Sequence, residues 1–194
     1  DRNAYVVVDV ETAGPTPASY AMLSIGACTL GEPQHSFYIE LQPDKESIRQ
    51  QSLDVSGLDF AELAERGTPP ATAMQAFADW LAEAIPADTA PIFTAFNAPF
   101  DWMFVDHYFH RYLGHNPFGY KALDIKALYM GYAAVPWLET AHMAIAPRYD
   151  LPTDLPHNAL EDARISAQML DALLQDIFLE ERDHDRYTQP TGRT

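Results

Sequence analysis

The apolar positions of this chain predict strands and helices in alternation, as in an α/β domain. Five short runs are rich in β-branched and aromatic residues and end at turn-forming residues, which indicates strands. These runs are residues 4–12, 22–30, 34–41, 91–96 and 122–125. In the first run, apolar side chains occupy both faces. Because an inner strand is buried on both faces, we expect residues 4–12 in the middle of the sheet.

Apolar residues three or four positions apart predict the helices that cover this sheet. Such spacing is found in residues 69–85, 100–112, 126–132 and 158–177. Asn158 is the expected N-cap of the last helix, and Glu161, three residues later, completes a capping-box pattern. Residues 44–67 have only weak helical spacing. Residues 133–156 contain four prolines and predict loops with one short helix near 138–145.

The length of 194 residues suits one domain with a sizeable core. No repeat or shift in composition divides the chain, so we expect one domain over residues 1–180. Residues 181–194 are charged and aperiodic and predict a loose C-terminal tail. No apolar run approaches the length of a membrane span, so we expect no membrane partner. The single cysteine, Cys28, lies in an apolar run and indicates a buried core residue in a protein of the reducing cytoplasm.

The charge of the chain limits how it can bind a polyanion. The 28 Asp and Glu residues outnumber the 12 Lys and Arg residues, which gives a net charge of −16 at pH 7. Proteins that hold long nucleic acids by their surface need many cations to neutralise phosphates. We therefore expect any contact with a nucleic acid to be short, local and carried largely by bound metal.

Acidic residues follow or open several predicted elements. Asp9 and Glu11 lie two apart at the end of the first strand, so their side chains point to the same face. Two buried carboxylates repel each other, and a divalent cation with oxygen ligands removes that conflict. A solvated strand end explains the pair equally well. Asp101 and Asp162 open two predicted helices, and His157 precedes the last of them.

Three segments decide between these alternatives. Residues 9–14 (DVETAG), 97–101 (NAPFD) and 157–163 (HNALEDA) resemble the three exonuclease motifs of the DEDDh superfamily in order, spacing and neighbours. The histidine five residues before the last acid is part of that pattern. The resemblance spans residues 4–178, and within the superfamily it is greatest to ribonuclease T, oligoribonuclease and related stand-alone 3'-5' exonucleases.

The resemblance implies a ribonuclease H-like α/β fold with a mixed five-stranded sheet flanked by helices. It implies two divalent metal ions, Mg²⁺ or Mn²⁺, and a histidine general base. The metal ligands would be Asp9, Glu11, Asp101 and Asp162, and the base would be His157. It also implies release of nucleoside 5'-monophosphates from the 3' end of single-stranded RNA or DNA. We expect RNA more than DNA, and the superfamily members that the chain resembles most imply a homodimer.

Substrate contacts are expected next to the three motifs. Thr12, with its backbone N–H, is a candidate for holding the terminal 3'-hydroxyl. Leu23 is a candidate wedge against the terminal base or, equally, a residue of the strand core. Further substrate-binding candidates are Asn97 and Phe100, and weaker stacking candidates are Phe96, Phe100 and Trp102. The second half of the chain has few cations, which could contact phosphates but as scattered surface charges need no function, and the second interpretation is favoured for most of them: Arg111, Lys121, Lys126 and Arg148.

The chain also departs from the superfamily pattern. Ser24 stands where many members carry Glu, and Phe96 stands where His precedes the Asn of the second motif. Neither position is a metal ligand, so these departures affect substrate choice. Three alternatives stay open: a proofreading subunit acting with a DNA polymerase, a catalytically silent nucleic-acid-binding protein, and a structural metal-binding domain.

Overall fold

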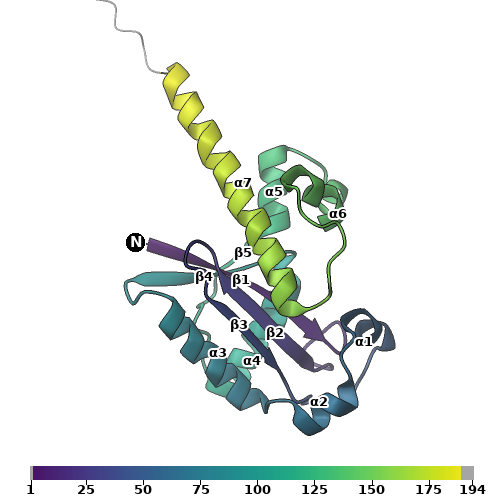
Figure 1. Ribbon diagram of the computed structural model, residues 1–194. Coiled ribbons are helices and arrows are strands. Elements are labelled where there is room, and N and C mark those ends of the chain that lie inside the picture. The colour runs from purple at the N-terminus through teal and green to yellow at the C-terminus, as the bar shows by residue number, and fades with distance from the viewer. Residues whose placement is uncertain (1, 189–194) are drawn as a thin grey trace, which may run out of the picture.

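The computed structural model describes the backbone of residues 2–188 and the side chains of residues 3–179. Its centre is a five-stranded sheet with the strand order β3-β2-β1-β4-β5 (Figure 1). The strands are β1 Arg2–Thr12, β2 Met22–Thr29, β3 Ser36–Glu40, β4 Thr89–Ala95 and β5 Ala122–Asp124. The strands β1, β2 and β3 pair antiparallel, whereas β4 is parallel to β1 and β5 is parallel to β4. The predicted mixed five-stranded sheet is therefore confirmed.

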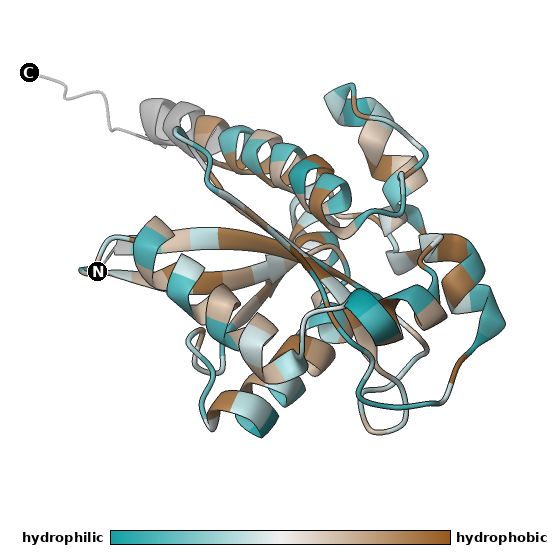
Figure 2. Cartoon of the chain, turned by 60° about the horizontal axis from the view of Figure 1, so that its bottom comes forward, coloured by the Kyte–Doolittle hydropathy of each residue, from teal (hydrophilic) through white to brown (hydrophobic). Residues whose placement is uncertain are grey.

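Helices cover both faces of this sheet (Figure 1). They are α1 Gln50–Ser56, α2 Phe60–Arg66, α3 Pro70–Ala84, α4 Ala98–Leu113, α5 Ile125–Ala133, α6 His142–Ile145 and α7 Ala159–Thr188, with 3-10 turns η1 Trp137–Thr140 and η2 Ala146–Tyr149. Hydrophobic residues are concentrated in the strands, whereas the helices alternate hydrophobic and hydrophilic residues (Figure 2). This pattern is expected of helices that bury one side against a sheet.

The alternation of β1 divides the core into two parts. Val6, Val8 and Val10 pack with residues of α3 and α4 on one face. Val7 packs with residues of α5, α6 and α7 on the other face. Cys28 belongs to this second part, and burial raises the pKa of its thiol to about 12, as expected of a core residue rather than a reactive thiol.

Three segments differ from their sequence-based predictions. Residues 44–67 contain two helices, and α1 has no buried residue, so it carries no apolar stripe that could predict it. Residues 133–156 form η1, α6 and η2 instead of one short helix. The last helix continues past residue 180 to Thr188, so residues 181–188 of the expected loose tail are helical. The rest of that tail, 189–194, lies outside the described residues.

The predicted N-cap of α7 is confirmed. The Asn158 side-chain oxygen accepts hydrogen bonds from the backbone N–H groups of Leu160 and Glu161, both at 3.2 Å. The second half of the capping box is absent among the contacts of the described residues, since the Glu161 carboxylate instead contacts Arg164 at 2.7 Å. Within the described part of the chain, no helix is long and apolar enough to cross a membrane.

Candidate active site

The end of β1 presents two acids to the α7 face of the sheet. Asp9 and Glu11 share the parity of Val7, which packs against α7, so their side chains point toward that helix. Both residues are partly buried. They pair across the β1–β2 ladder with Gly26 and Ser24, respectively. The two acids therefore lie beneath the start of α7.

Gly26 allows α7 to begin directly on the sheet. A Cβ atom at this position would lie 2.1 Å from the Ala159 carbonyl carbon and from the Leu160 backbone nitrogen. Any side chain on Gly26 would therefore push the first turn of α7 away from β2. Because this turn carries Asp162, Gly26 determines how close that acid comes to Asp9 and Glu11.

The acids of β1 and α7 form one cluster, which we call the three-acid cluster. One carboxylate oxygen from each of Asp9, Glu11 and Asp162 lies within 4.8 Å of the other two. Burial and mutual repulsion raise the pKa of Asp9 well above its ordinary value. The same causes raise the pKa of Glu11 to about 7, and burial raises that of Asp162 to about 6.

The three-acid cluster fits a divalent cation. The Oδ1 atom of Asp162 is buried without a hydrogen-bond partner in the described protein. Carboxylate oxygens are the ligands that Mg²⁺ and Mn²⁺ prefer, and a cation would offset both the repulsion and the unpaired oxygen. The raised pKa values are thus a property of the protein without its cation.

Asp101 lies beside this cluster but outside the group of three. It is 4% exposed, and its Oδ1 accepts a hydrogen bond of 3.1 Å from the backbone N–H of Val10. Burial raises the pKa of Asp101 to about 8 although this hydrogen bond lowers it. Asn97, which precedes α4, adopts a left-handed conformation with φ of 68° and so turns the chain from β4 into the helix. Asn97 thereby helps to position Asp101.

His157 lies in the loop that leads into α7. Its side chain is exposed, and its backbone has φ of 55° in the left-handed region. The positive charge and the main chain of His157 lower the pKa of Asp162, against the larger effect of burial. The structure therefore brings His157 close to Asp162 without making it part of the three-acid cluster.

A cavity of about 300 Å³ adjoins the cluster. Its lining consists of Val10, Glu11, Thr12, Gln51, Ser52, Val55 and Phe100. Two of the expected substrate-binding residues, Thr12 and Phe100, are thus in this cavity. The Thr12 hydroxyl donates a hydrogen bond to the Gly14 carbonyl at 2.9 Å. Three lining residues come from α1, and the weak helical spacing of residues 44–67 gave no signal for them.

The structure does not support Leu23 as a substrate-binding residue. Its side chain has no exposed surface and packs in a small core with Ala13, Ala21 and Leu63. The alternative interpretation of Leu23, a strand core residue, is correct, because α2 supplies a second layer over this part of β2. Ser24, beside it, is also fully buried, and its hydroxyl is without a partner among the described residues.

Solved structures with the same fold define the class. The nuclease domain of 3'hExo, a DEDDh family member solved with bound rAMP, superposes with a TM-score of 0.76 at 15% identity, over 90% of this chain and 93% of that one. Escherichia coli Exonuclease I in complex with a dT13 oligonucleotide gives a TM-score of 0.69 at 15% identity, over 89% of this chain and 41% of that one. The fold is that of the DEDDh 3'-5' exonucleases.

Sequence comparison identifies the family within that class. The model of the 3'-5' exoribonuclease Rv2179c-like domain matches residues 4–174, and the chain belongs to this family. The 3'-5' DNA exonuclease Cap18 of Escherichia coli is 41% identical over 186 residues, which are 96% of this chain and 98% of that protein. The expected membership in the DEDDh 3'-5' exonucleases is therefore confirmed.

Proposed function

We propose that this protein removes nucleotides one at a time from the 3' end of single-stranded nucleic acid by metal-dependent hydrolysis. One observation carries the proposal: the three-acid cluster shares Glu11 with a cavity of nucleotide-like size. A 3'-terminal nucleotide in this cavity would bring its phosphodiester to the cluster. Hydrolysis there would release a nucleoside 5'-monophosphate.

Two divalent ions, Mg²⁺ or Mn²⁺, are the proposed cofactors. Asp9, Glu11 and Asp162 would hold them directly, and Asp101 would act from its position against the Val10 amide. When bound, such ions lower the pKa of water and stabilise the charge on the attacking and leaving oxygens. The protein contributes the fixed positions of its carboxylates, which β1 and the first turn of α7 hold together.

His157 is the proposed general base. Its imidazole is exposed at the edge of the cluster, close enough to Asp162 to affect the pKa of that acid. Imidazole is the side chain that most often serves as a general base in enzymes. It would take the proton from the attacking water, and the loop before Asn158 gives the ring room to reach it.

The terminal nucleotide is proposed to lie between Phe100 and α1. Phe100 offers a half-buried ring to this cavity, and Gln51 and Ser52 of α1 offer polar groups to it. Thr12 would hold the 3'-hydroxyl. The family description names an exoribonuclease, whereas Cap18 is named a DNA exonuclease. We propose RNA as the preferred substrate, with DNA as the direct comparison.

Degradation of 5'-labelled oligomers tests this proposal. Single-stranded RNA and DNA of equal sequence are incubated with Mg²⁺ or Mn²⁺, and wild type is compared with Asp9→Asn. We expect a ladder that shortens by single nucleotides from the 3' end and is absent with Asp9→Asn. If Asp9→Asn is as active as wild type, the assignment of the cluster is wrong. Binding without a ladder under both metals would instead favour a silent nucleic-acid-binding protein.

A further inference from the structure

A patch of aromatic rings around one lysine lies next to the three-acid cluster and is not used in the site described above. We call it the Trp137 patch, and it consists of Phe96, Lys126 and Trp137. The Lys126 ammonium lies 4.3 Å from the ring centroid of Trp137 and 5.9 Å from that of Phe96. Trp137 is 47% exposed. The patch therefore offers solvent an aromatic surface with a positive charge against it.

The register of the sheet places this patch beside the cluster. Thr94 of β4 pairs with Val7 of β1. The pairing ends there and β4 ends at Ala95, so Phe96 is the first residue beyond the strand next to β1, at the end of the sheet where Asp9 lies. Phe96 packs against the core on the α7 face, which is also the face to which Asp9 points. The patch thus begins one strand away from the three-acid cluster.

The charge of Lys126 sets the patch apart from its surroundings. Among the described residues, Lys126 forms no ion pair with a carboxylate, in a chain with a net charge of −16. Arg148, another cation of this region, is paired with Asp176 at 3.2 Å. An unpaired cation next to exposed rings is the combination by which proteins hold single strands, through phosphate contacts and base stacking.

The cavity, the three-acid cluster and the Trp137 patch lie in an order that suggests the path of a substrate. Glu11 belongs to both the cavity and the three-acid cluster, and Phe96 directly follows β4, the strand next to the one that carries Asp9. A strand with its 3' nucleotide in the cavity and its scissile phosphate at the cluster reaches the patch next. We propose that the Trp137 patch binds the nucleotides 5' to the scissile bond, with a base on Trp137 and a phosphate at Lys126. This inference rests on the proposed exonuclease function.

The opposite direction, across β3, is less suited to a polyanion. Tyr38 is 37% exposed there and is level with Gly26, which pairs with Asp9. Its hydroxyl donates a hydrogen bond of 2.8 Å to the Glu40 carboxylate. A phosphate that followed this ring would meet that negative charge. The aromatic surface next to a cation is therefore the favoured route, and Tyr38 marks the rival route.

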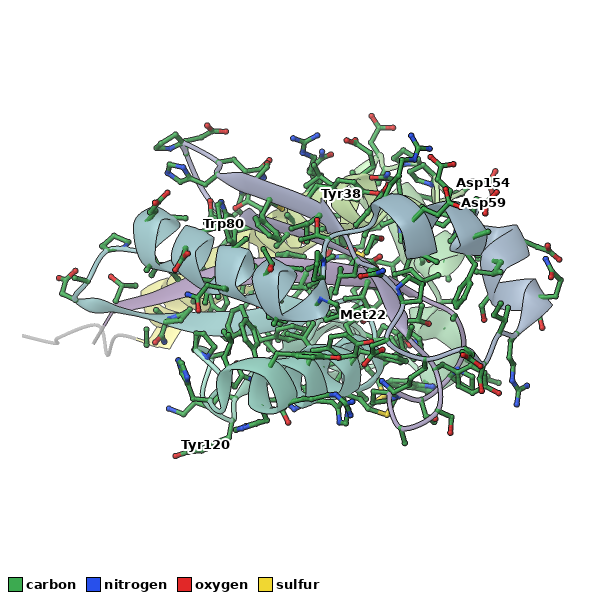
Figure 3. The ribbon with its side chains drawn as sticks, turned by 90° about the horizontal axis from the view of Figure 1, so that it is seen from below. Met22, Tyr38, Asp59, Trp80, Tyr120 and Asp154 are labelled. Atoms are coloured by element: carbon green, nitrogen blue, oxygen red, sulfur yellow. The ribbon has the colours of Figure 1, made fainter. Side chains whose placement is uncertain are left out.

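Substrates of increasing length test the patch separately from the chemistry. The p-nitrophenyl ester of thymidine 5'-monophosphate reaches only the cavity and the cluster. A dinucleotide adds one nucleotide 5' to the scissile bond, and a single-stranded octamer extends fully over the patch. Trp137→Ala, Trp137→Phe and Lys126→Ala are compared with wild type on all three. Tyr120→Ala and Lys121→Ala are the matched controls, because they remove an exposed ring and an exposed cation outside the patch. Tyr120 is 87% exposed and lies on the other side of the molecule from Tyr38 (Figure 3).

We expect Trp137→Ala to raise KM for the octamer roughly tenfold, the size of one lost stacking contact, with the ester unchanged. Trp137→Phe should keep most of the affinity because it keeps a ring. Lys126→Ala should raise the same KM and lower the slope of its salt dependence by about one. The controls should match wild type.

Two results would overturn the inference. One is a Trp137→Ala enzyme that equals wild type on the octamer, above all if Tyr38→Ala shows the length-dependent loss. The other is an equal loss on the ester and on the octamer, which would make Trp137 a structural residue. A wild-type enzyme that cleaves none of the three substrates with Mg²⁺ or Mn²⁺ would overturn the proposed function itself.

Discussion

Substitution of Gly26 by alanine should separate the two halves of the metal site. The new Cβ would lie 2.1 Å from backbone atoms of Ala159 and Leu160, whereas ordinary contact begins at 3.4 Å. The first turn of α7 must therefore move by roughly 1.3 Å, the difference of these two distances. Metal ligands tolerate about 0.2 Å, and a misplacement of about 1 Å can reduce a rate on the order of 100-fold.

The expected result of Gly26→Ala is a loss of activity larger than its loss of stability. Backbone overpacking of this kind costs about 1–3 kcal/mol of unfolding free energy, which leaves most of a typical domain folded. We expect kcat on the p-nitrophenyl ester to fall on the order of 100-fold and the Mn²⁺ concentration for half-maximal rate to rise. Both are measured alongside thermal unfolding.

Gly131→Ala is the matched control for Gly26→Ala. A Cβ at Gly131, in α5, meets no atom within 4 Å. Alanine favours a helix interior over glycine by about 0.5–1 kcal/mol, so this variant should be slightly more stable and equally active. If Gly26→Ala keeps the rate and metal dependence of wild type, the close approach of α7 to β2 does not set the geometry of the acids, and the reasoning is refuted.

Three further predictions concern charge and hydrogen bonding. In the metal-free protein the pKa of Glu11 is raised from 4.5 to about 7. The protonated carboxyl therefore contributes unfolding free energy that is fully present below pH 4.5 and is lost as the pH rises through 7. Mn²⁺ should restore the lost stability, measured as a higher temperature of thermal unfolding at pH 7. His157→Ala should lower kcat on the order of 100-fold without changing Mn²⁺ affinity by calorimetry; weaker binding would make His157 a ligand. Tyr108→Phe removes the hydroxyl that accepts from the buried Met22 N–H (2.8 Å) and donates to Asp44 (2.6 Å). The free energy of unfolding, measured in urea, should fall by about 1–3 kcal/mol. An unchanged urea midpoint would contradict this role of Tyr108.

The sheet and the acids were predictable because each has a local signal. Valines on both faces of β1 indicate an inner strand, and the period of two puts Asp9 and Glu11 on one face. The meeting of these acids with Asp162 could be expected only from the resemblance to a known superfamily. Chain spacing contains no information on how closely α7 approaches Gly26, which is a property of packing.

The parts that escaped prediction depend on tertiary structure. Leu23 lies in an apolar strand in either interpretation, and only the placement of α2 over it decides that it is core. Gln51 and Val55 line the cavity only because α1 lies next to the end of β1, and the sequence does not specify that packing. Residues 181–188 are helical but lack the apolar residues at every third or fourth position that predict the earlier turns of α7.

The lack of buried residues in α1 has a consequence for how this enzyme can diversify. None of the seven residues of α1 is fully buried, and only Leu53 packs against the small core around Leu23, yet three others line the cavity at the end of β1. Surface substitutions of this kind usually change stability by less than about 0.5 kcal/mol. Substitutions of the three cavity residues Gln51, Ser52 and Val55 should therefore cost little folding stability, while in the proposed function they would change the wall next to the terminal nucleotide. Descendants of one ancestor can acquire different preferences there while the acids beneath stay the same.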